Sequence, residues 1–213
     1  LSIYALDGDV VPIDWTQKNF WEYLVNVQWT EESEIYLTVQ NRNQTSMGIL
    51  RVDSVTGDVE EIYRWTDEYW VEIISGAPKV IGEHIVTVED RGEARALVVD
   101  NVQISSSDIQ IRSLIHCDNK GVVTAVSENP LEQHIMHFDL DGKATQLSKG
   151  AGVHDAVSNG SLTVIQSRSM DFDGVQTSIY IKNVQIAEVE DRSENPVITL
   201  NANFHTLGER SLE

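Results

Sequence analysis

Cysteine is almost absent from this sequence, and basic residues are scarce. The single cysteine, Cys117, excludes a disulfide bond within the chain. It ends the apolar run Ile111–Cys117, which predicts a buried small hydrophobic side chain rather than a reactive thiol. One unpaired cysteine favours a cytoplasmic location, although a secreted domain poor in cysteine would have the same composition.

Long apolar runs are missing too. No stretch approaches the roughly 20 residues that a membrane-spanning helix needs, and the N-terminus has no basic segment followed by an apolar core. We therefore expect neither a membrane segment nor a signal peptide within these residues. Because Leu1 already lies in a strand-like pattern, we expect the chain to be a fragment of a longer protein.

Positive charge is in the minority. The 34 acidic and 15 basic residues give a formal net charge of −19, and such a field repels nucleic acid and anionic membrane surfaces. We therefore expect no nucleic-acid partner. The acidic residues are spread along the chain, a distribution that favours a general role in solubility. Attraction of cationic ligands, such as peptide amino termini, is the alternative.

The motifs of catalysis and metal binding are also missing. The sequence contains no Gly-x-Ser-x-Gly string, which would present a nucleophilic serine on a strained turn. His134 and His137 are three residues apart, a spacing that places them on opposite faces of a strand. The segment Asp171–Gly174 begins like a calcium loop but lacks the later ligands. We expect no enzyme activity from this chain alone, no metal site and no cofactor.

What the sequence does contain is a repeat. A strand-like segment that ends in Asp or Asn recurs five times, and its last residue stands at positions 7, 53, 100, 139 and 183. The successive spacings are 46, 47, 39 and 44 residues. Strand repeats of about 40–50 residues are typical of β-propeller blades.

Each repeat contains further strand patterns between turn residues. Within Glu34–Gln40, Ile35, Leu37 and Val39 stand at every second position and share one face of a predicted strand. Helical periodicity is not sustained anywhere, and Trp15–Trp21 is the one stretch that could hold a helical turn. The second repeat is predicted to contain four strands, at Val71–Ile74, His84–Glu89, Arg95–Asp100 and Val102–Ser105.

The predicted fold class is all-β, with about four β-propeller blades, each a four-stranded antiparallel sheet, in a partial ring. Residues 1–22 would be the end of a preceding blade and a connector, residues 23–191 the four blades, and residues 192–213 a linker. An open arc exposes apolar blade faces at both ends, and faces of that size favour association. We therefore expect a homo-oligomer, with two arcs closing one ring as a possible arrangement.

Several segments carry a family likeness. They are Tyr23–Thr30, Leu50–Gly57, Asp67–Glu72, Ser127–His134 and Phe138–Gly142. In this order they resemble the propeller of dipeptidyl-peptidase-IV-like serine exopeptidases of the prolyl oligopeptidase superfamily. The tail segment Leu207–Arg210 resembles the link to that family's catalytic domain.

The resemblance carries expectations about the rest of the protein. The family has an eight-bladed propeller followed by an α/β-hydrolase domain, so this chain would be about the second half of the propeller. The paired glutamates that hold the amino terminus of the substrate would then lie upstream.

One position of the likeness concerns a binding residue. The family often has a Gly-aromatic-Arg element after the second strand of a blade, where the aromatic ring and the arginine line the substrate pocket. The matching stretch here is Asp90–Arg95, in which Arg95 fits the arginine whereas Ala94 replaces the aromatic residue. Arg95 is therefore the candidate substrate-binding residue, and an ordinary ion pair at a strand edge is the alternative.

These observations lead to one main hypothesis. The chain is the non-catalytic propeller portion of a dipeptidyl-peptidase-IV-like serine peptidase and acts as an access filter and pocket wall for a peptide substrate. The chemistry, release of N-terminal dipeptides, would come from the Ser-Asp-His triad of a downstream α/β-hydrolase domain. A stand-alone propeller that serves as an interaction scaffold is the alternative, and a carbohydrate-active propeller is a third hypothesis.

Overall fold

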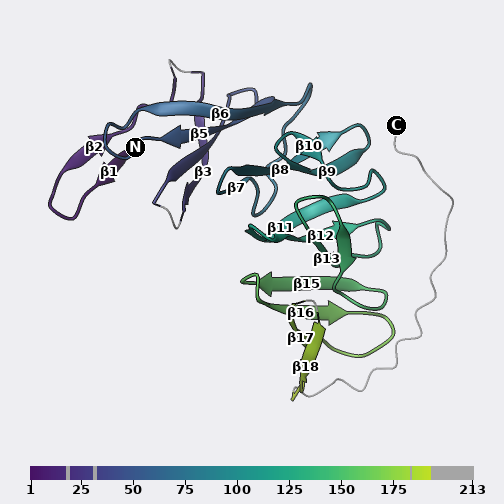
Figure 1. The fold of residues 1–213 in the computed structure, drawn as a ribbon. Helices are drawn as coiled ribbons and strands as arrows, with labels where there is room; N and C mark the ends of the chain where they lie inside the picture. The colour runs from purple at the N-terminus through teal and green to yellow at the C-terminus, as the bar shows by residue number, and fades with distance from the viewer. Residues whose placement is uncertain (18–19, 31–32, 183, 193–213) are drawn as a thin grey trace.

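The chain folds into β-sheets. The computed structural model describes residues 1–17, 20–30, 33–182 and 184–192, and these residues form no helix, hence none able to cross a membrane. Four four-stranded antiparallel sheets follow one another along an open arc, preceded by a two-stranded sheet (Figure 1). The prediction of an all-β partial propeller is confirmed. Asn183 and, apart from Arg192, the predicted linker with its Leu207–Arg210 segment lie outside the described residues.

The strands of each sheet are hydrogen-bonded in chain order. The N-terminal sheet contains β1 (Ser2–Tyr4) and β2 (Val10–Pro12). The first blade contains β3 (Tyr23–Trp29), β4 (Ile35–Gln40), β5 (Ser46–Val52) and β6 (Val59–Thr66). The second contains β7 (Lys79–Ile81), β8 (His84–Arg91), β9 (Ala94–Val99) and β10 (Val102–Gln103). The third contains β11 (Gln110–Asp118), β12 (Gly121–Ser127), β13 (His134–Phe138) and β14 (Ala144–Gln146). The fourth contains β15 (Val153–Ser158), β16 (Leu162–Arg168), β17 (Gln176–Ile181) and β18 (Val184–Val189).

The repeated aspartates end the third strand of a blade and start the turn into the fourth. In the first blade the carboxylate of Asp53 accepts a hydrogen bond from the amide of Val55 at 2.8 Å. In the third blade Asp139 accepts one from the amide of Lys143 at 2.8 Å. A short acceptor side chain suits this place because it satisfies amides that the hairpin leaves unpaired. The repeat in the sequence therefore corresponds to the turn between the third and fourth strands of a blade.

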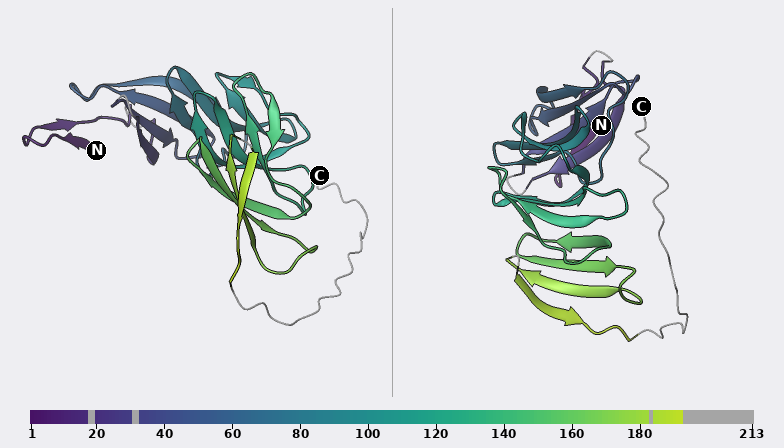
Figure 2. Two further views of the ribbon diagram at one scale, coloured as in Figure 1. Left: turned by 60° about the horizontal axis from the view of Figure 1, so that its bottom comes forward. Right: turned by 90° about the vertical axis from the view of Figure 1, so that its right-hand side faces the viewer.

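The second and third blades lie between two others, and the N-terminal segment packs on the outer side of the first blade (Figure 2). Middle strands in these places are buried on both faces. Every residue of β4 and of β12 is buried. In β4, Leu37 faces the N-terminal segment, whereas Tyr36 faces the second blade and belongs to one cluster with Val80. Successive side chains of β4 therefore point to two different apolar surroundings, and neither face of the strand is exposed to solvent.

Separate apolar cores join neighbouring blades. The second and third blades meet in a core that includes Val88, Leu97, Ile111 and Phe138. The third and fourth blades meet in a smaller core that includes Val123, Ile135, Ile165 and Tyr180.

The N-terminal segment covers part of the first blade. Trp21 is fully buried there, and Ile13 lies beside it against β4 and β5. The described residues of Trp15–Trp21 form a turn, not a helix. β3 stays partly open, with Val27 and Trp29 exposed at 45% and 61%.

One predicted strand of the second blade is wrong. Val71–Ile74 is irregular, and the first strand of this blade is β7. Val71 and Ile74 are nevertheless buried, because Val71 is held against the first blade and Ile74 packs into the core between the second and third blades. The amide of Val71 donates to the carbonyl of Gln44 at 2.8 Å, and the side chain of Gln40 donates to the carbonyl of Val71 at 3.1 Å. A buried connection thus produced the local pattern of a short strand.

The outer face of the fourth blade is apolar, and none of the residues that the structure describes covers it. Strand pairing places one row of side chains from β15–β18 on the side away from the third blade. The exposed apolar members of this row, here called the terminal face, are Val153, Val157, Leu162, Ile181, Val184 and Val189. On the opposite side of the same sheet, Ile165 and Tyr180 are buried against the third blade.

We expect Gly48→Ala to destabilise the fold by about 1–3 kcal/mol. A methyl group at Gly48 would lie 2.6 Å from Cζ2 and 2.9 Å from Cη2 of Trp21, which has no room to move because it is fully buried. Urea denaturation measures the change. Gly92→Asn is the control. Gly92 has a positive φ that asparagine tolerates, and an added Cβ would meet no atom within 4 Å. Equal stability of Gly48→Ala and the parent protein would contradict the packing described for Trp21.

We expect the Cys117 thiol to resist labelling in the native state. It packs against the core between the second and third blades, and burial raises its pKa to about 12. Since the thiolate is the reactive form, labelling at pH 8 should be on the order of a thousandfold slower than in denaturant. Reaction with a disulfide reagent, calibrated on a free thiol, measures the ratio. Comparable native and denatured rates would show that Cys117 is accessible.

Candidate functional site

The two ends of each blade carry different connections. The strands of a blade alternate in direction, so the hairpin between its second and third strands and the connection to the next blade lie at the same end. We call this end of the arc the connector face. Two pockets between neighbouring blades open there.

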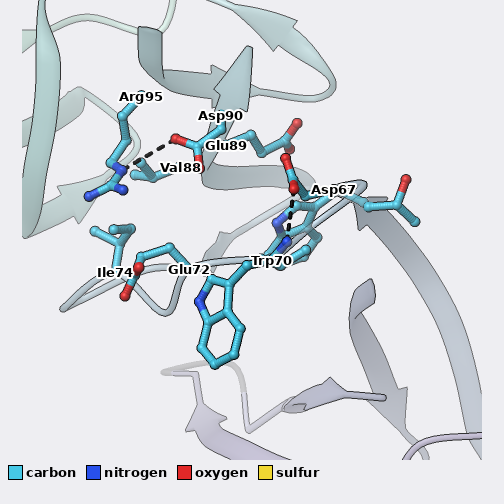
Figure 3. Close-up of a pocket in the computed structure, with 11 residues that line it drawn as sticks. Asp67, Trp70, Glu72, Ile74, Val88, Glu89, Asp90 and Arg95 are labelled. Carbon is cyan, nitrogen blue, oxygen red and sulfur yellow. Dashed lines mark hydrogen bonds and ion pairs between the residues drawn. The ribbon is translucent and has the colours of Figure 1, made fainter. Parts of the chain in front are cut away.

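The first pocket lies between the first and second blades and contains Arg95 (Figure 3). One wall is the connection that follows β6, and the other is the β8–β9 hairpin with the strand ends beside it. The charged side chains that line it are four carboxylates and one guanidinium, from Asp67, Glu72, Glu89, Asp90 and Arg95. The pocket is therefore anionic overall.

Arg95 is held at the beginning of β9. It lies directly opposite Asp90 in the β8–β9 pair, and its Nε is 3.3 Å from Oδ1 of Asp90. Its amide donates to Oε1 of Gln110 at 2.8 Å, which ties the strand to the third blade. The guanidinium thus lines the pocket and takes part in a strand-edge ion pair at once. The neighbouring Ala94 is buried, so it adds no wall where the family has an aromatic ring.

Glu89 is the buried carboxylate of the pocket. Its Oε1 accepts hydrogen bonds from the hydroxyls of Tyr63 at 2.8 Å and Thr87 at 2.5 Å. Its Oε2 accepts from Nη2 of Arg91 at 2.9 Å. Burial and the hydrogen bond to Glu89 raise the pKa of Tyr63 to about 12, so this phenol stays protonated. Glu89 is fully engaged and joins the first blade to the second.

Asp67 organises the opposite wall. Its Oδ1 accepts hydrogen bonds from the amides of Tyr69 at 2.7 Å and Trp70 at 2.9 Å. These two bonds hold the pKa of Asp67 below its ordinary value, so the carboxylate is charged at neutral pH. The turn leaves Trp70 half-exposed beside the pocket mouth (Figure 3).

The first pocket is small. Its volume is about 30 Å³, which suits one or two water molecules. Its lining residues include no histidine, serine or cysteine, so they do not form a Ser-His or Cys-His pair. In this arrangement it can contribute a charged wall and cannot enclose a peptide.

The second pocket lies between the third and fourth blades and is larger, at about 540 Å³. That volume is within the range of ligand-binding clefts. The β12–β13 hairpin contributes Leu131 and Glu132, the connection to β15 contributes Gly152, and the fourth blade contributes Val153 and Met170. Leu131 and Met170 are strongly exposed, so the pocket is apolar and open to solvent.

Sequence reasoning named Arg95 but missed the carboxylates around it. Asp67 could have been found from its turn, in which an aspartate precedes two exposed aromatic residues. Glu72 and Glu89 come from different segments and meet only through packing of the two blades. His134 and His137 stand apart from any metal cluster, and the residues that the structure describes contain no group of three or more potential ligands.

Comparison with known proteins identifies the family. A family model described as the dipeptidyl peptidase IV N-terminal region matches residues 5–180. No curated protein sequence matches the chain.

A solved structure shares the fold. The crystal structure of Porphyromonas gingivalis dipeptidyl peptidase 4 aligns with a TM-score of 0.72 and 16% sequence identity. The alignment covers 89% of this chain but 29% of that protein, so the chain spans less than a third of its length. The family resemblance drawn from the residues is confirmed, since the family match extends over most of the chain: this protein belongs to the family of the dipeptidyl peptidase IV N-terminal region.

Proposed function

We propose that this chain is part of the propeller of a dipeptidyl-peptidase-IV-like serine peptidase and acts there as a substrate-access and pocket-wall domain. The observation that carries the proposal is the family match over residues 5–180, on a chain with four blades in an open arc. The release of N-terminal dipeptides would be performed by a downstream α/β-hydrolase domain, because the chain has no Gly-x-Ser-x-Gly nucleophile motif.

The connector face is the side we assign to the substrate. Both pockets between blades open on it, one anionic and one apolar. A peptide with a free amino terminus carries a positive charge, which the carboxylates of Asp67, Glu72 and Asp90 would attract. Arg95 would offer hydrogen-bond donors to a peptide carbonyl, at the expense of its exposed pair with Asp90. An exposed ion pair is weak enough to exchange partners.

The first test is the coding sequence and the activity of the longer protein. We expect the reading frame to continue past Glu213 into a domain with Gly-x-Ser-x-Gly, and the longer protein to release dipeptides from chromogenic dipeptidyl substrates. A stop codon soon after Glu213, or a closed propeller without hydrolase activity, would favour the interaction scaffold.

The second test concerns Arg95. In the longer protein, we expect Arg95→Gln to raise KM for dipeptidyl substrates by about 3–20-fold with little change in kcat, since it removes uniform binding of a peptide carbonyl. Arg51→Gln is the control, because Arg51 also forms an exposed cross-strand ion pair, with Glu60, but lies beside the β5–β6 hairpin at the opposite end of the blade. Equal KM values for the two variants would show that Arg95 is only a strand-edge partner.

We also propose that the isolated chain self-associates through the terminal face. At the junctions within the chain, the corresponding blade faces are buried against another four-stranded sheet. The terminal face has the same apolar character, and none of the described residues packs on it, so another blade is the surface that fits it. For the isolated chain in solution, that blade comes from a second copy. The exposed row on β3 with Val27 and Trp29 is the other apolar strand surface it could meet.

Substitution of a charge into the terminal face tests this association. We expect Val157→Lys to raise the dimer dissociation constant at least about tenfold, because a lysine would be buried at the contact. Val102→Lys is the control, since Val102 is exposed to a similar degree, 62% against 68%, but lies on the second blade. Sedimentation equilibrium measures both. A monomeric parent chain at high concentration, or equal weakening by both variants, would refute the association through this face.

A further inference from the structure

Two histidines stack at the junction of the third and fourth blades. His134 begins β13 and His154 is the second residue of β15, and their ring centroids are 5.3 Å apart with 28° between the planes. His154 is fully buried, whereas the side chain of His134 is 18% exposed. Of the described histidines, these two form the stacked pair.

The partners of His154 are fully satisfied by a neutral ring with its proton on Nε2. Nε2 lies 3.2 Å from the carbonyl oxygen of Gly150, which can only accept, so Nε2 must donate. Nδ1 lies 2.7 Å from the hydroxyl of Ser167, which donates to it when the ring is neutral. Both nitrogens are therefore satisfied without a positive charge.

The partners of His134 define the same tautomer. Nε2 lies 3.0 Å from Oε2 of Glu132, so it donates to a carboxylate. Nδ1 faces the hydroxyl of Ser148 at 3.1 Å and the side-chain amide nitrogen of Gln146 at 3.2 Å. The Ser148 hydroxyl already accepts from the amide of Ile135 at 3.0 Å, which leaves its proton for Nδ1. A proton on Nδ1 would oppose the amide N–H of Gln146 and break that contact.

The same junction is fastened by backbone hydrogen bonds around Gln133. Its amide donates to the carbonyl of Gly152, and its carbonyl accepts from the amide of His154, each at 3.0 Å. Its side chain donates to the carbonyl of His154 at 3.0 Å and to Asp155 at 3.1 Å. The two imidazoles therefore lie in the joint itself, next to the bonds that hold the fourth blade.

The groups around the two histidines shift the pKa of His154 in opposite directions. Glu132 contacts His134, and Asp155 lies beside His154, where Arg168 partly neutralises it. Burial is the largest influence on His154, and with the neighbouring His134 it holds the pKa of His154 below its ordinary value of 6.5, against Glu132, Asp155 and the Gly150 carbonyl. Two protonated rings in a stack would also repel each other.

We propose that His134 and His154 form an acid-sensitive joint that fastens the fourth blade to the third when neutral and loosens it when protonated. The joint borders the larger pocket of the connector face, since Glu132, Gly152 and Val153 line that pocket. Loosening would therefore change the shape of this pocket as well as the position of the fourth blade. The proposal does not depend on the peptidase assignment.

The sign of the pH effect follows from linkage. The folded state disfavours protonation of His154, so the unfolded state binds more protons once the pH falls below about 6.5. The contribution of His154 to stability is full above that pH and declines as the pH falls toward its lower folded pKa. Between about pH 7.5 and pH 5 the unfolding equilibrium constant should rise several-fold from this source.

Hydrogen exchange and urea denaturation of the chain test the joint. On acidification, we expect exchange, corrected for its intrinsic pH dependence, to rise several-fold more at the amides of Gln133 and His154 than in the second blade. His154→Phe keeps an aromatic ring in the stack and removes the titration, so its stability should vary less with pH. His137→Gln is the control, because it removes a histidine from the same strand, β13, outside the pair.

Two further measurements keep the test decisive. If His154→Phe does not fold, His134→Gln leaves the buried ring and removes its stacked neighbour, so it should flatten the pH dependence in part, because the burial of His154 remains. NMR titration of the His154 ring in the parent chain should show a midpoint below 6.5. The proposal is overturned if His154 titrates at or above 6.5, or if His137→Gln flattens the profile as much as the variants of the pair.

Discussion

Burial of both faces of every blade is the constraint on which the structure depends. A four-stranded sheet with apolar residues on both sides cannot be stable in water alone, so each blade requires a neighbour on either side. Strands β4 and β12 are fully buried for this reason. The arc results from the stacking of twisted sheets on one another. In the described part of the chain, Trp21 covers part of the outer side of the first blade, whereas the apolar terminal face of the fourth blade remains exposed.

The junctions differ in how they meet the constraint. The second and third blades share the largest apolar core, whereas the third and fourth share a smaller one supplemented by histidine, serine and glutamine side chains. Between the first and second blades, Gln28 exchanges hydrogen bonds with the backbone of Val80, at 2.7 and 3.0 Å. Polar contacts of this kind fix the register of two sheets, and those with imidazoles also depend on pH.

The two pockets lie where connections, not strands, determine the surface. The connector face collects segments that are far apart in sequence, and it brings Asp67, Glu72 and Arg95 into one pocket. Strand residues set the positions, since Arg95 is fixed by its pairing with Asp90. This division between a rigid sheet and a variable edge is common in scaffolds that bind ligands.

The sequence by itself determined the all-β class and the blade repeat, because aspartate turns and alternating apolar residues are local signals that recur every 39 to 47 residues. The family followed from the resemblance of five segments in the right order. The sequence did not determine that Val71–Ile74 is a buried connection, since burial of two apolar residues has the same local pattern in a strand and in a loop. Tertiary structure alone decided the stack of His134 on His154 and the set of carboxylates around Arg95. Those contacts join residues of separate blades or connections, and their distance is set by how two sheets pack, which no local pattern encodes.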